Sequence, residues 1–203
     1  MVLPAYIDAT GALTDGEAWV ALASTEVTGA TAANVTLTSP DDGSSTDWSQ
    51  FMDLVLICYA QLYGASYGAN NAAFGCKINS GSSASTANQA LIGDGSSASA
   101  NLETFTDGRF RWTDGAADGT LDTEVFSASV VQFFDINSGK YKSVLAQSAS
   151  DFDGAGFVTL NGITWQSQDP IKSLYLYSWS GGISGWSVGT RFDLFGVLPR
   201  MVS

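Results

Sequence analysis

Residues 64–68 read Gly-Ala-Ser-Tyr-Gly and match G-x-S-x-G, the pattern of a serine nucleophile on a strand-to-helix turn. An apolar, strand-like run (LVLICYA, 54–60) precedes this motif, but no helical periodicity follows it. The chain contains no histidine, and a serine hydroxyl is a weak nucleophile unless a neighbouring base takes its proton. Ser66 is therefore interpreted as part of a Gly/Ser/Tyr hairpin loop.

Two pairs of carboxylates have a spacing that suits an acid and a base on either side of a glycosidic bond. Glu103 and Asp107 form the first pair, and Asp122 and Glu124 the second. Asp122 and Glu124 share one face of a possible strand, because residues i and i+2 point the same way. Nothing else in the sequence indicates a sugar-cleaving site. We therefore expect a non-enzymatic protein without catalytic residues.

Two acidic stretches raise the question of calcium. Asp151 and Asp153 precede a glycine, but position twelve of an EF-hand loop, which should be Glu, is Gly162. Residues 113–124 offer a better oxygen cluster, made by Asp114, Asp118, Asp122 and Glu124. Aspartates in Asp-Gly turns usually accept hydrogen bonds from their own backbone. No metal or other cofactor is therefore expected.

Six tryptophans in 203 residues suggest binding through aromatic side chains. Along 171–179, Tyr175, Tyr177 and Trp179 alternate with Leu174 and Leu176 and so share one face of a strand. An exposed Tyr/Tyr/Trp row could stack on sugar rings, and Trp186 in the following loop completes the candidate binding set: Tyr175, Tyr177, Trp179 and Trp186. The alternative is that this face packs in the core or at a subunit interface, where Tyr and Trp are common.

The charge of the chain limits its partners. The net charge is −12, and eight acids precede the first basic residue, Lys77. No nucleic-acid partner is expected, because binding phosphates needs a basic face. A basic protein surface suits residues 1–45 better, although acidity also simply keeps a protein soluble.

Membrane association and disulfide bonds are not expected either. No apolar run approaches the roughly 20 residues that span a bilayer, and the N-terminus lacks the basic flank and apolar run of a secretory signal. Cys58 and Cys76 both fall in strand-like segments. Two cysteines without a secretory signal are typical of buried free thiols.

Alternating patterns and β-forming residues dominate the chain, and they predict an all-β fold. Seven Asp-Gly pairs and one Asn-Gly pair favour tight turns between the strands. This pattern fits an antiparallel β-sandwich or jelly roll with long Gly/Ser-rich loops. Strands are predicted at 17–24, 33–38, 50–60, 72–79, 100–106, 109–113, 123–135, 140–148, 156–165, 171–179 and 190–198.

The domain organisation follows from composition. Residues 1–16 are predicted to form an N-terminal arm, and 17–203 a single β-sandwich domain. Residues 80–100 are rich in Gly, Ser and Ala and are predicted to form a flexible loop inserted in that domain. The final strand should place Phe192, Leu194 and Gly196 on its core face, with Gly196 allowing a neighbour to approach closely.

Two stretches of the chain, 46–82 and 140–198, resemble bacteriophage virion β-sandwich proteins. In the first, Phe51, Leu54 and Leu56 are followed by a small-residue loop and then by Phe74, Ile78, Asn79 and Gly81. In the second, Trp165 precedes a strand that begins at Ile171, and the loop SGGISGWSV leads to GTRFDLFGV at 189–197. The closing strand is the specific part of the resemblance. Gln61 departs from it, since an Arg is expected there.

This resemblance implies a structural role in a virion. A capsid decoration or cement protein that stabilises the phage head is the first expectation, and a tail or head-fibre component is the alternative. The implied partners are the major capsid protein or other virion proteins. A homo-oligomer is also expected, and the resemblance implies a trimer. A carbohydrate-binding module that recognises host surface glycans remains a further alternative, based on the tyrosines and tryptophans above.

Overall fold

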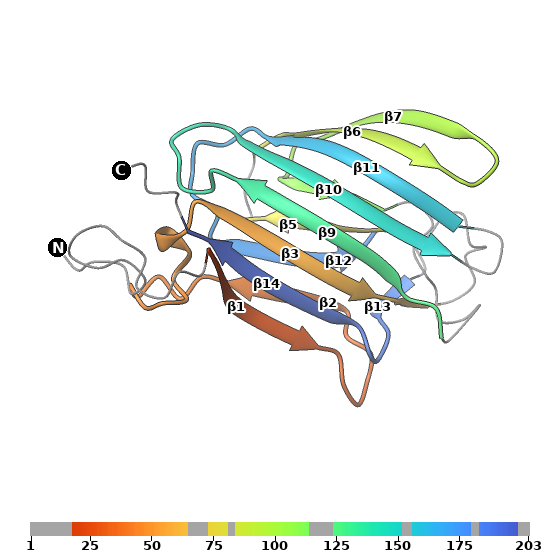
Figure 1. Cartoon of the computed structure of the whole chain (residues 1–203), viewed down its shortest axis with the longest axis horizontal. Helices are drawn as coiled ribbons and strands as arrows, with labels where there is room; N and C mark the ends of the chain where they lie inside the picture. Colours follow the sequence, from red (N-terminus) through yellow and green to blue (C-terminus); the bar gives the residue numbers. More distant parts are fainter. Residues whose placement is uncertain are drawn as a thin grey trace.

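The computed structural model describes residues 18–64, 73–80, 84–113, 124–151, 156–179 and 183–198. Its strands form an eight-stranded, a four-stranded and a two-stranded sheet, and every strand pair is antiparallel. Figure 1 shows the large sheet in front of β5, β12 and β2 of the four-stranded sheet. The predicted all-β antiparallel sandwich is confirmed.

The large sheet has the strand order β1-β14-β3-β9-β10-β11-β6-β7, the four-stranded sheet β2-β12-β5-β8, and the small one β13-β4. One 3-10 turn, η1 (Trp48–Gln50), precedes β3. The strands are β1 (Trp19–Glu26), β2 (Asn34–Thr38), β3 (Asp53–Ala60), β4 (Leu62–Gly64), β5 (Phe74–Ile78), β6 (Thr86–Gly93), β7 (Ala98–Phe105), β8 (Arg109–Arg111), β9 (Ser127–Phe134), β10 (Lys142–Asp151), β11 (Gly156–Trp165), β12 (Ser173–Ser178), β13 (Ile183–Trp186) and β14 (Arg191–Val197).

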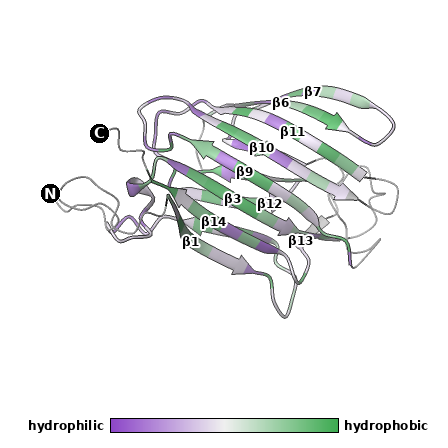
Figure 2. Ribbon diagram, in the orientation of Figure 1, coloured by the Kyte–Doolittle hydropathy of each residue, from purple (hydrophilic) through white to green (hydrophobic). Residues whose placement is uncertain are grey.

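The core lies between the two larger sheets and follows directly from the period-two patterns. Leu54 and Leu56 of β3 and Phe133 of β9 point inward from the large sheet, and Leu174 and Leu176 of β12 point inward from the other; all five are fully buried. Figure 2 shows hydrophobic and hydrophilic residues alternating along the central strands. Alternation in the sequence therefore becomes one buried and one outward face on each strand.

Polar groups join the sheets where the apolar core ends. The carbonyl oxygen of Trp112 accepts hydrogen bonds from Thr159 Oγ1 (2.7 Å), Asn161 Nδ2 (3.0 Å) and Ser148 Oγ (3.2 Å). Asn88 Nδ2 on β6 donates to the carbonyl oxygen of Arg111 on β8 (2.8 Å). These bonds satisfy buried polar groups and fix β8 against the large sheet.

The closing strand β14 lies inside the large sheet, between β1 and β3. Phe192 and Leu194 are fully buried and Gly196 is also buried, as predicted. A Cβ atom added at Gly196 would lie 2.4 Å from the Phe51 ring, so the glycine leaves room for that aromatic side chain. The close approach expected at this position is therefore confirmed.

The flexible loop predicted at 80–100 is wrong over most of its length. Residues 86–93 form β6, which pairs with β11 on one side and with β7 on the other. Ala, Asn, Gln and Gly dominate β6, and these residues have low intrinsic strand propensity. Pairing with two neighbouring strands outweighs that propensity, because strand preference depends strongly on context.

Other differences are local. Asn161-Gly162 lies within β11, as the strand predicted at 156–165 requires, and not in the turn that an Asn-Gly pair favours. Strands β4 and β13 were not predicted, and β13 occupies part of the SGGISGWSV stretch read as a loop. The predicted arm, 1–16, lies outside the described residues. No helix in the described parts of the chain is long and apolar enough to cross a membrane.

Candidate functional site

Three of the four predicted binding residues lie together on the outer face of the four-stranded sheet. Tyr175 and Tyr177 alternate with the buried leucines of β12, and Trp179 directly follows the strand; each is partly exposed. The rings of Tyr175 and Tyr177 have centroids 5.8 Å apart, and so do those of Tyr177 and Trp179. We call this set the aromatic row.

The aromatic row ends in a packed cluster. The Phe105 ring meets Trp179 edge-on at 4.8 Å, and the Arg109 guanidinium lies 5.0 Å from Trp179 and 5.1 Å from Phe105, measured to the ring centroids. Successive rings of the row are inclined by 29° and 31°, so they cover part of one another's faces. The aromatic row has the composition of a sugar-binding platform, but much of the ring surface is covered by the neighbouring rings, Phe105 and Arg109.

Charged groups border the aromatic row. Asp107 pairs with Arg109 (3.2 Å) and with Lys77 (3.6 Å), which lies beside Tyr175 in the strand register. Burial raises the pKa of the Tyr177 phenol well above its usual range, and its hydroxyl has no hydrogen-bond partner among the described residues. The Tyr177 hydroxyl is thus not open to a ligand, and the donors and acceptors at the border of the row are those of Lys77, Arg109 and Asp107.

Trp186, the fourth predicted binding residue, is not on this surface. It is fully buried and packs against Phe74 (5.3 Å) and Phe192 (4.9 Å) between ring centroids. The loop assignment that made it a candidate overlooked β13, which places its ring in the core. Trp186 is therefore a structural residue in this fold.

The carboxylates considered for acid-base chemistry do not form a catalytic pair where they are described. Both oxygens of Glu103 bind Arg111, at 2.7 and 2.8 Å, while Asp107 is held by Lys77 and Arg109. Ser66 and the acidic residues at 114–122 and 153 lie outside the described residues. No group of three or more possible metal ligands is found in the parts of the chain that are described.

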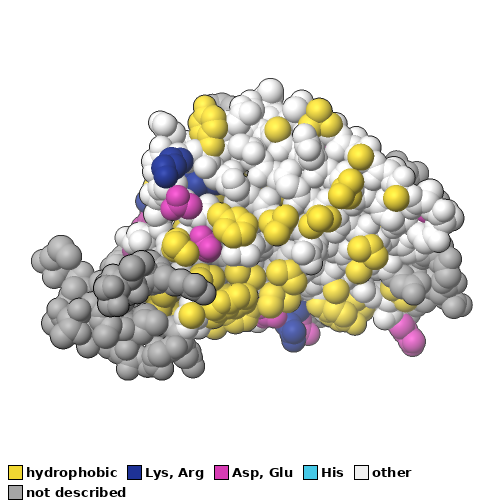
Figure 3. Space-filling view, turned by 45° about the horizontal axis from the view of Figure 1, so that its top comes forward, with side chains coloured by type: hydrophobic (Ala, Val, Ile, Leu, Met, Phe, Trp, Pro, Cys, Tyr) yellow, Lys and Arg dark blue, Asp and Glu magenta, His cyan; other side chains and the backbone are white. Residues whose placement is uncertain are grey.

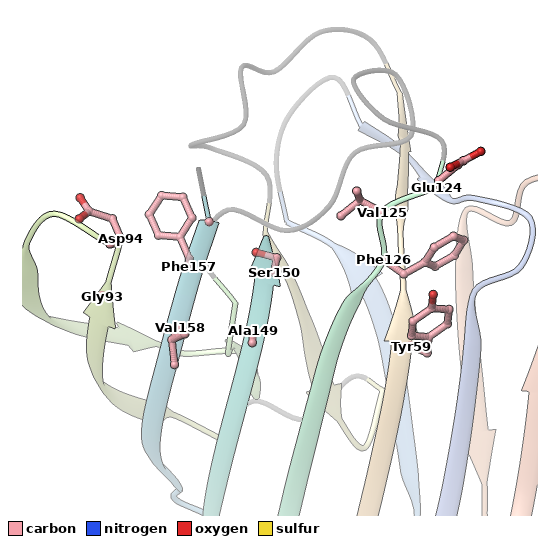
Figure 4. Close-up of a pocket in the computed structure, with 12 residues that line it drawn as sticks. Tyr59, Gly93, Asp94, Glu124, Val125, Phe126, Ala149, Ser150, Phe157 and Val158 are labelled. Carbon is pink, nitrogen blue, oxygen red and sulfur yellow. The ribbon is translucent and has the colours of Figure 1, made fainter. Parts of the chain in front are cut away.

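A hollow of about 640 Å³ opens at one end of the large sheet (Figure 4). Tyr59 and Phe126 stack at one side with ring centroids 4.7 Å apart, and Glu124 is nearby. Asp94 lies at the other side, where its carboxylate accepts hydrogen bonds from Ser96 and Ser97. The Asp94 carboxylate thus stabilises the turn in which it lies.

The outer face of the large sheet is the most unusual surface of the molecule. On β3, β9, β10, β11, β6 and β7, 22 outward-facing residues are uncharged; two acids stand at alternate positions of the same strands, Asp53 at the buried start of β3 and Asp151 at the end of β10. We call the set of 22 uncharged residues the uncharged face. It consists of Ile57, Tyr59, Ala87, Gln89, Leu91, Gly93, Ala98, Ala100, Leu102, Thr104, Ala128, Val130, Gln132, Phe134, Ser143, Leu145, Gln147, Ala149, Val158, Leu160, Gly162 and Thr164.

Large apolar side chains on the uncharged face are open to solvent. Val158 is 65 % exposed, Leu102 63 % and Leu91 60 %. Figure 3 shows a broad area of hydrophobic and uncharged side chains with charged groups toward its margins. Arg191 and Asp193 form an ion pair (2.9 Å) on β14, which pairs with β3 beside the uncharged face.

A shallow hollow interrupts the uncharged face. It measures about 570 Å³ and is lined mainly by apolar groups, including Leu91, Leu102, Leu145 and Leu160. Gly162 lies at its floor, and a Cβ atom added there would meet no atom within 4 Å. The missing side chain thus creates a depression among exposed leucines.

Sequence reasoning did not find this face, although a signal for it was present. In SVLAQSA (143–149) and VTLNGIT (158–164), the residues on both faces of the strand are uncharged. An antiparallel strand with one solvated face usually carries polar or charged residues there. Which of the two faces is buried and which is free depends on strand pairing.

The chain is thus an all-β sandwich with two candidate binding surfaces, the aromatic row and the uncharged face. No protein-family model matches it, and a search of curated proteins finds no match.

Proposed function

We propose that this chain is a non-enzymatic structural protein of a bacteriophage virion, a decoration or cement protein that binds and stabilises the head. The observation that carries the proposal is the uncharged face, because a large exposed apolar patch is typical of an interaction surface. The assignment to a phage particle rests on the resemblance of 46–82 and 140–198 to virion β-sandwich proteins. The proposed partners are the major capsid protein or other virion proteins.

A homo-oligomer is part of this proposal. The trimer number rests on the resemblance, and the need to cover apolar area rests on the uncharged face. Residues 1–45 are proposed to anchor the protein on the particle, because they hold six acids and no base. The tail or fibre position remains the alternative within the virion.

The test is binding to particles that lack the protein. Purified chain is mixed with such particles and sedimented, at low salt and at about 0.5 M salt, where charges are screened beyond a few ångströms. Saturable binding together with a raised melting temperature of the particle supports a cement role. Absence of binding at both salt concentrations contradicts it. Loss of binding on deletion of 1–16, with unfolding temperature unchanged, supports the anchor, and retained binding contradicts it.

Glycan recognition is the second candidate function, and the partly exposed aromatic row favours it. Arg109, Lys77 and Asp107 could hydrogen-bond to hydroxyl groups beside the rings. The experiment is a glycan array with wild type, Trp179→Ala and a control, Trp19→Ala, since Trp19 is 50 % exposed on β1 of the other sheet. Binding lost only in Trp179→Ala supports this function. No binding by the wild type, or equal binding by all three, contradicts it.

A further inference from the structure

We infer that the uncharged face is the contact surface between copies of this chain. The inference deepens the proposed function by naming the partner that covers this face. Six of its side chains, Leu91, Leu102, Val130, Leu145, Val158 and Leu160, are each between 40 and 65 % exposed. In the strand register, Leu91 pairs with Leu160, and Gln147 of β10 pairs with both Leu160 and Val130. These side chains therefore lie on one continuous uncharged surface, in which the polar Gln147 stands between Val130 and Leu160.

The size of the uncharged face suits an interface. Strands lie about 4.8 Å apart and rise about 3.3 Å per residue, so five strands of about seven residues, together with the short part of β3 at Ile57 and Tyr59, cover roughly 600 Å². Two such faces would together bury about 1,200 Å², near the lower end of the range for stable specific interfaces. A patch of this area is also at the upper end of what monomeric proteins expose.

Charge identifies the partner as a second copy. Two chains of net charge −12 repel each other, and the repulsion is least where neither presents a charge. A partner chosen by opposite charge would be recognised through a charged rim or patch, whereas the 22 residues of this face carry none. Because none of the 22 residues is ionised, burying the face against its own copy removes none of their side chains' charges from water.

The shape of the face is compatible with self-packing. Sheets pack face to face about 10 Å apart with interdigitating side chains. The hollow at Gly162 can receive an apolar side chain from the copy, such as the Leu91 or Val158 that stand out beside it. Protruding leucines and a depression on the same surface are what a self-complementary contact requires.

The first experiment measures association. Wild type, the double variant Leu91→Lys/Leu160→Lys and the control Thr36→Lys are compared by analytical ultracentrifugation at 1–100 µM. Thr36 is exposed on β2, on the outer face of the other sheet, so the control adds a lysine at a comparable strand position. Wild type and control should sediment as two chains, because a self-complementary contact joins two copies and the trimer that the resemblance implies would need a further contact surface. The double variant should associate about 100-fold more weakly or not at all, because buried unpaired charges are costly.

A second measurement needs no variant. Hydroxyl-radical footprinting with mass spectrometry reports the oxidation of Leu91, Leu102 and Leu160 in wild type below and above the association midpoint. We expect oxidation of these leucines to fall at least threefold on association, while oxidation of Trp19 and Tyr175 stays the same. Equal oxidation at both concentrations, or a monomeric wild type at 100 µM, overturns the inference.

The outcomes separate this inference from the proposed function. A monomeric chain that binds particles overturns the inference and leaves the virion role standing. An oligomer that depends on Leu91 and Leu160 but does not bind particles supports the inference and contradicts the virion role. If the double variant still forms the oligomer but no longer binds particles, another virion protein covers the face, and the inference fails.

Discussion

Replacing Gly196 with alanine should destabilise the fold through one identifiable contact. The new methyl group would lie 2.4 Å from two atoms of the Phe51 ring and 2.8 Å from a third, whereas real Cβ contacts below 3.0 Å are essentially never seen. The ring must therefore move by about 0.6 Å or more. Phe51 is only 2 % exposed and packs in a cluster with Val20 and Leu198, so that movement disturbs a closed environment.

The expected loss follows from overpacking of a core. Adding a methylene to a well-packed interior typically costs about 1–3 kcal/mol, and about 1 kcal/mol shifts the melting temperature of a 150–250-residue domain by roughly 2–4 °C. Gly196→Ala should therefore lower the melting temperature by about 2–12 °C, measured by circular dichroism or calorimetry. The matched control is Gly93→Ala, also in a strand of the large sheet, where a Cβ atom would meet nothing within 4 Å.

A compensating substitution tests the cause. Phe51→Leu removes ring atoms from the site, so the double variant Gly196→Ala/Phe51→Leu should be more stable than the sum of the two single losses predicts, by about 0.5–1 kcal/mol. Purely additive losses would show that the Phe51 contact is not responsible. A Gly196→Ala variant as stable as Gly93→Ala would refute the reasoning.

Three further substitutions test how much buried polar side chains contribute to stability, two of them hydrogen-bonded and one without a partner among the described residues. Lys142→Met should lower the free energy of unfolding by about 1.5–3 kcal/mol in urea titrations, because the buried ammonium donates to the carbonyl oxygens of Ser138, Lys140 and Gln168; a loss below about 0.5 kcal/mol would contradict this. Desolvation raises the pKa of Asp47, but hydrogen bonds from Ser49, Gly43 and Ser39 outweigh it and hold the net pKa below its usual value. A carboxyl whose pKa is lower in the folded than in the unfolded state stabilises the fold at high pH, and this stabilisation is lost as the pH falls and the carboxyl is protonated. The difference in free energy of unfolding between wild type and Asp47→Asn should therefore narrow from pH 6 to pH 2. A difference that stays constant would count against this. Tyr177→Phe should change the free energy of unfolding by less than about 0.5 kcal/mol in urea titrations, because its buried hydroxyl has no hydrogen-bond partner among the described residues; a loss above about 1 kcal/mol would argue otherwise.

Several features of the fold could be predicted from the sequence because they depend on local alternation. In β14, Phe192 and Leu194 alternate with Arg191 and Asp193, and in β12 two leucines alternate with tyrosines. Such patterns are strong enough to identify the strand, its core face and the antiparallel sandwich class. The turn at Gly95 was equally local, because its backbone adopts a φ of +84°, which glycine tolerates and which Asp-Gly pairs favour.

The candidate sites could be predicted only in part. The aromatic row followed from spacing alone, since residues i and i+2 of any strand share a face. Trp186 could not be placed, because β13 pairs with β4 across more than a hundred residues of sequence and its own residues, Ile-Ser-Gly-Trp, look like a loop. Propensity is a weak guide where a strand is held by distant partners.

The amino-acid sequence by itself determined which residues alternate, where tight turns fall, and that the chain has no histidine and a large negative charge. Only the tertiary structure decided that β6 joins β11 and β7, and that the outward residues of six strands meet in one uncharged surface. Each strand contributes only two or four uncharged residues to that surface, which is unremarkable locally. The surface exists because hydrogen-bonded pairing sets strands from distant parts of the chain side by side in one register.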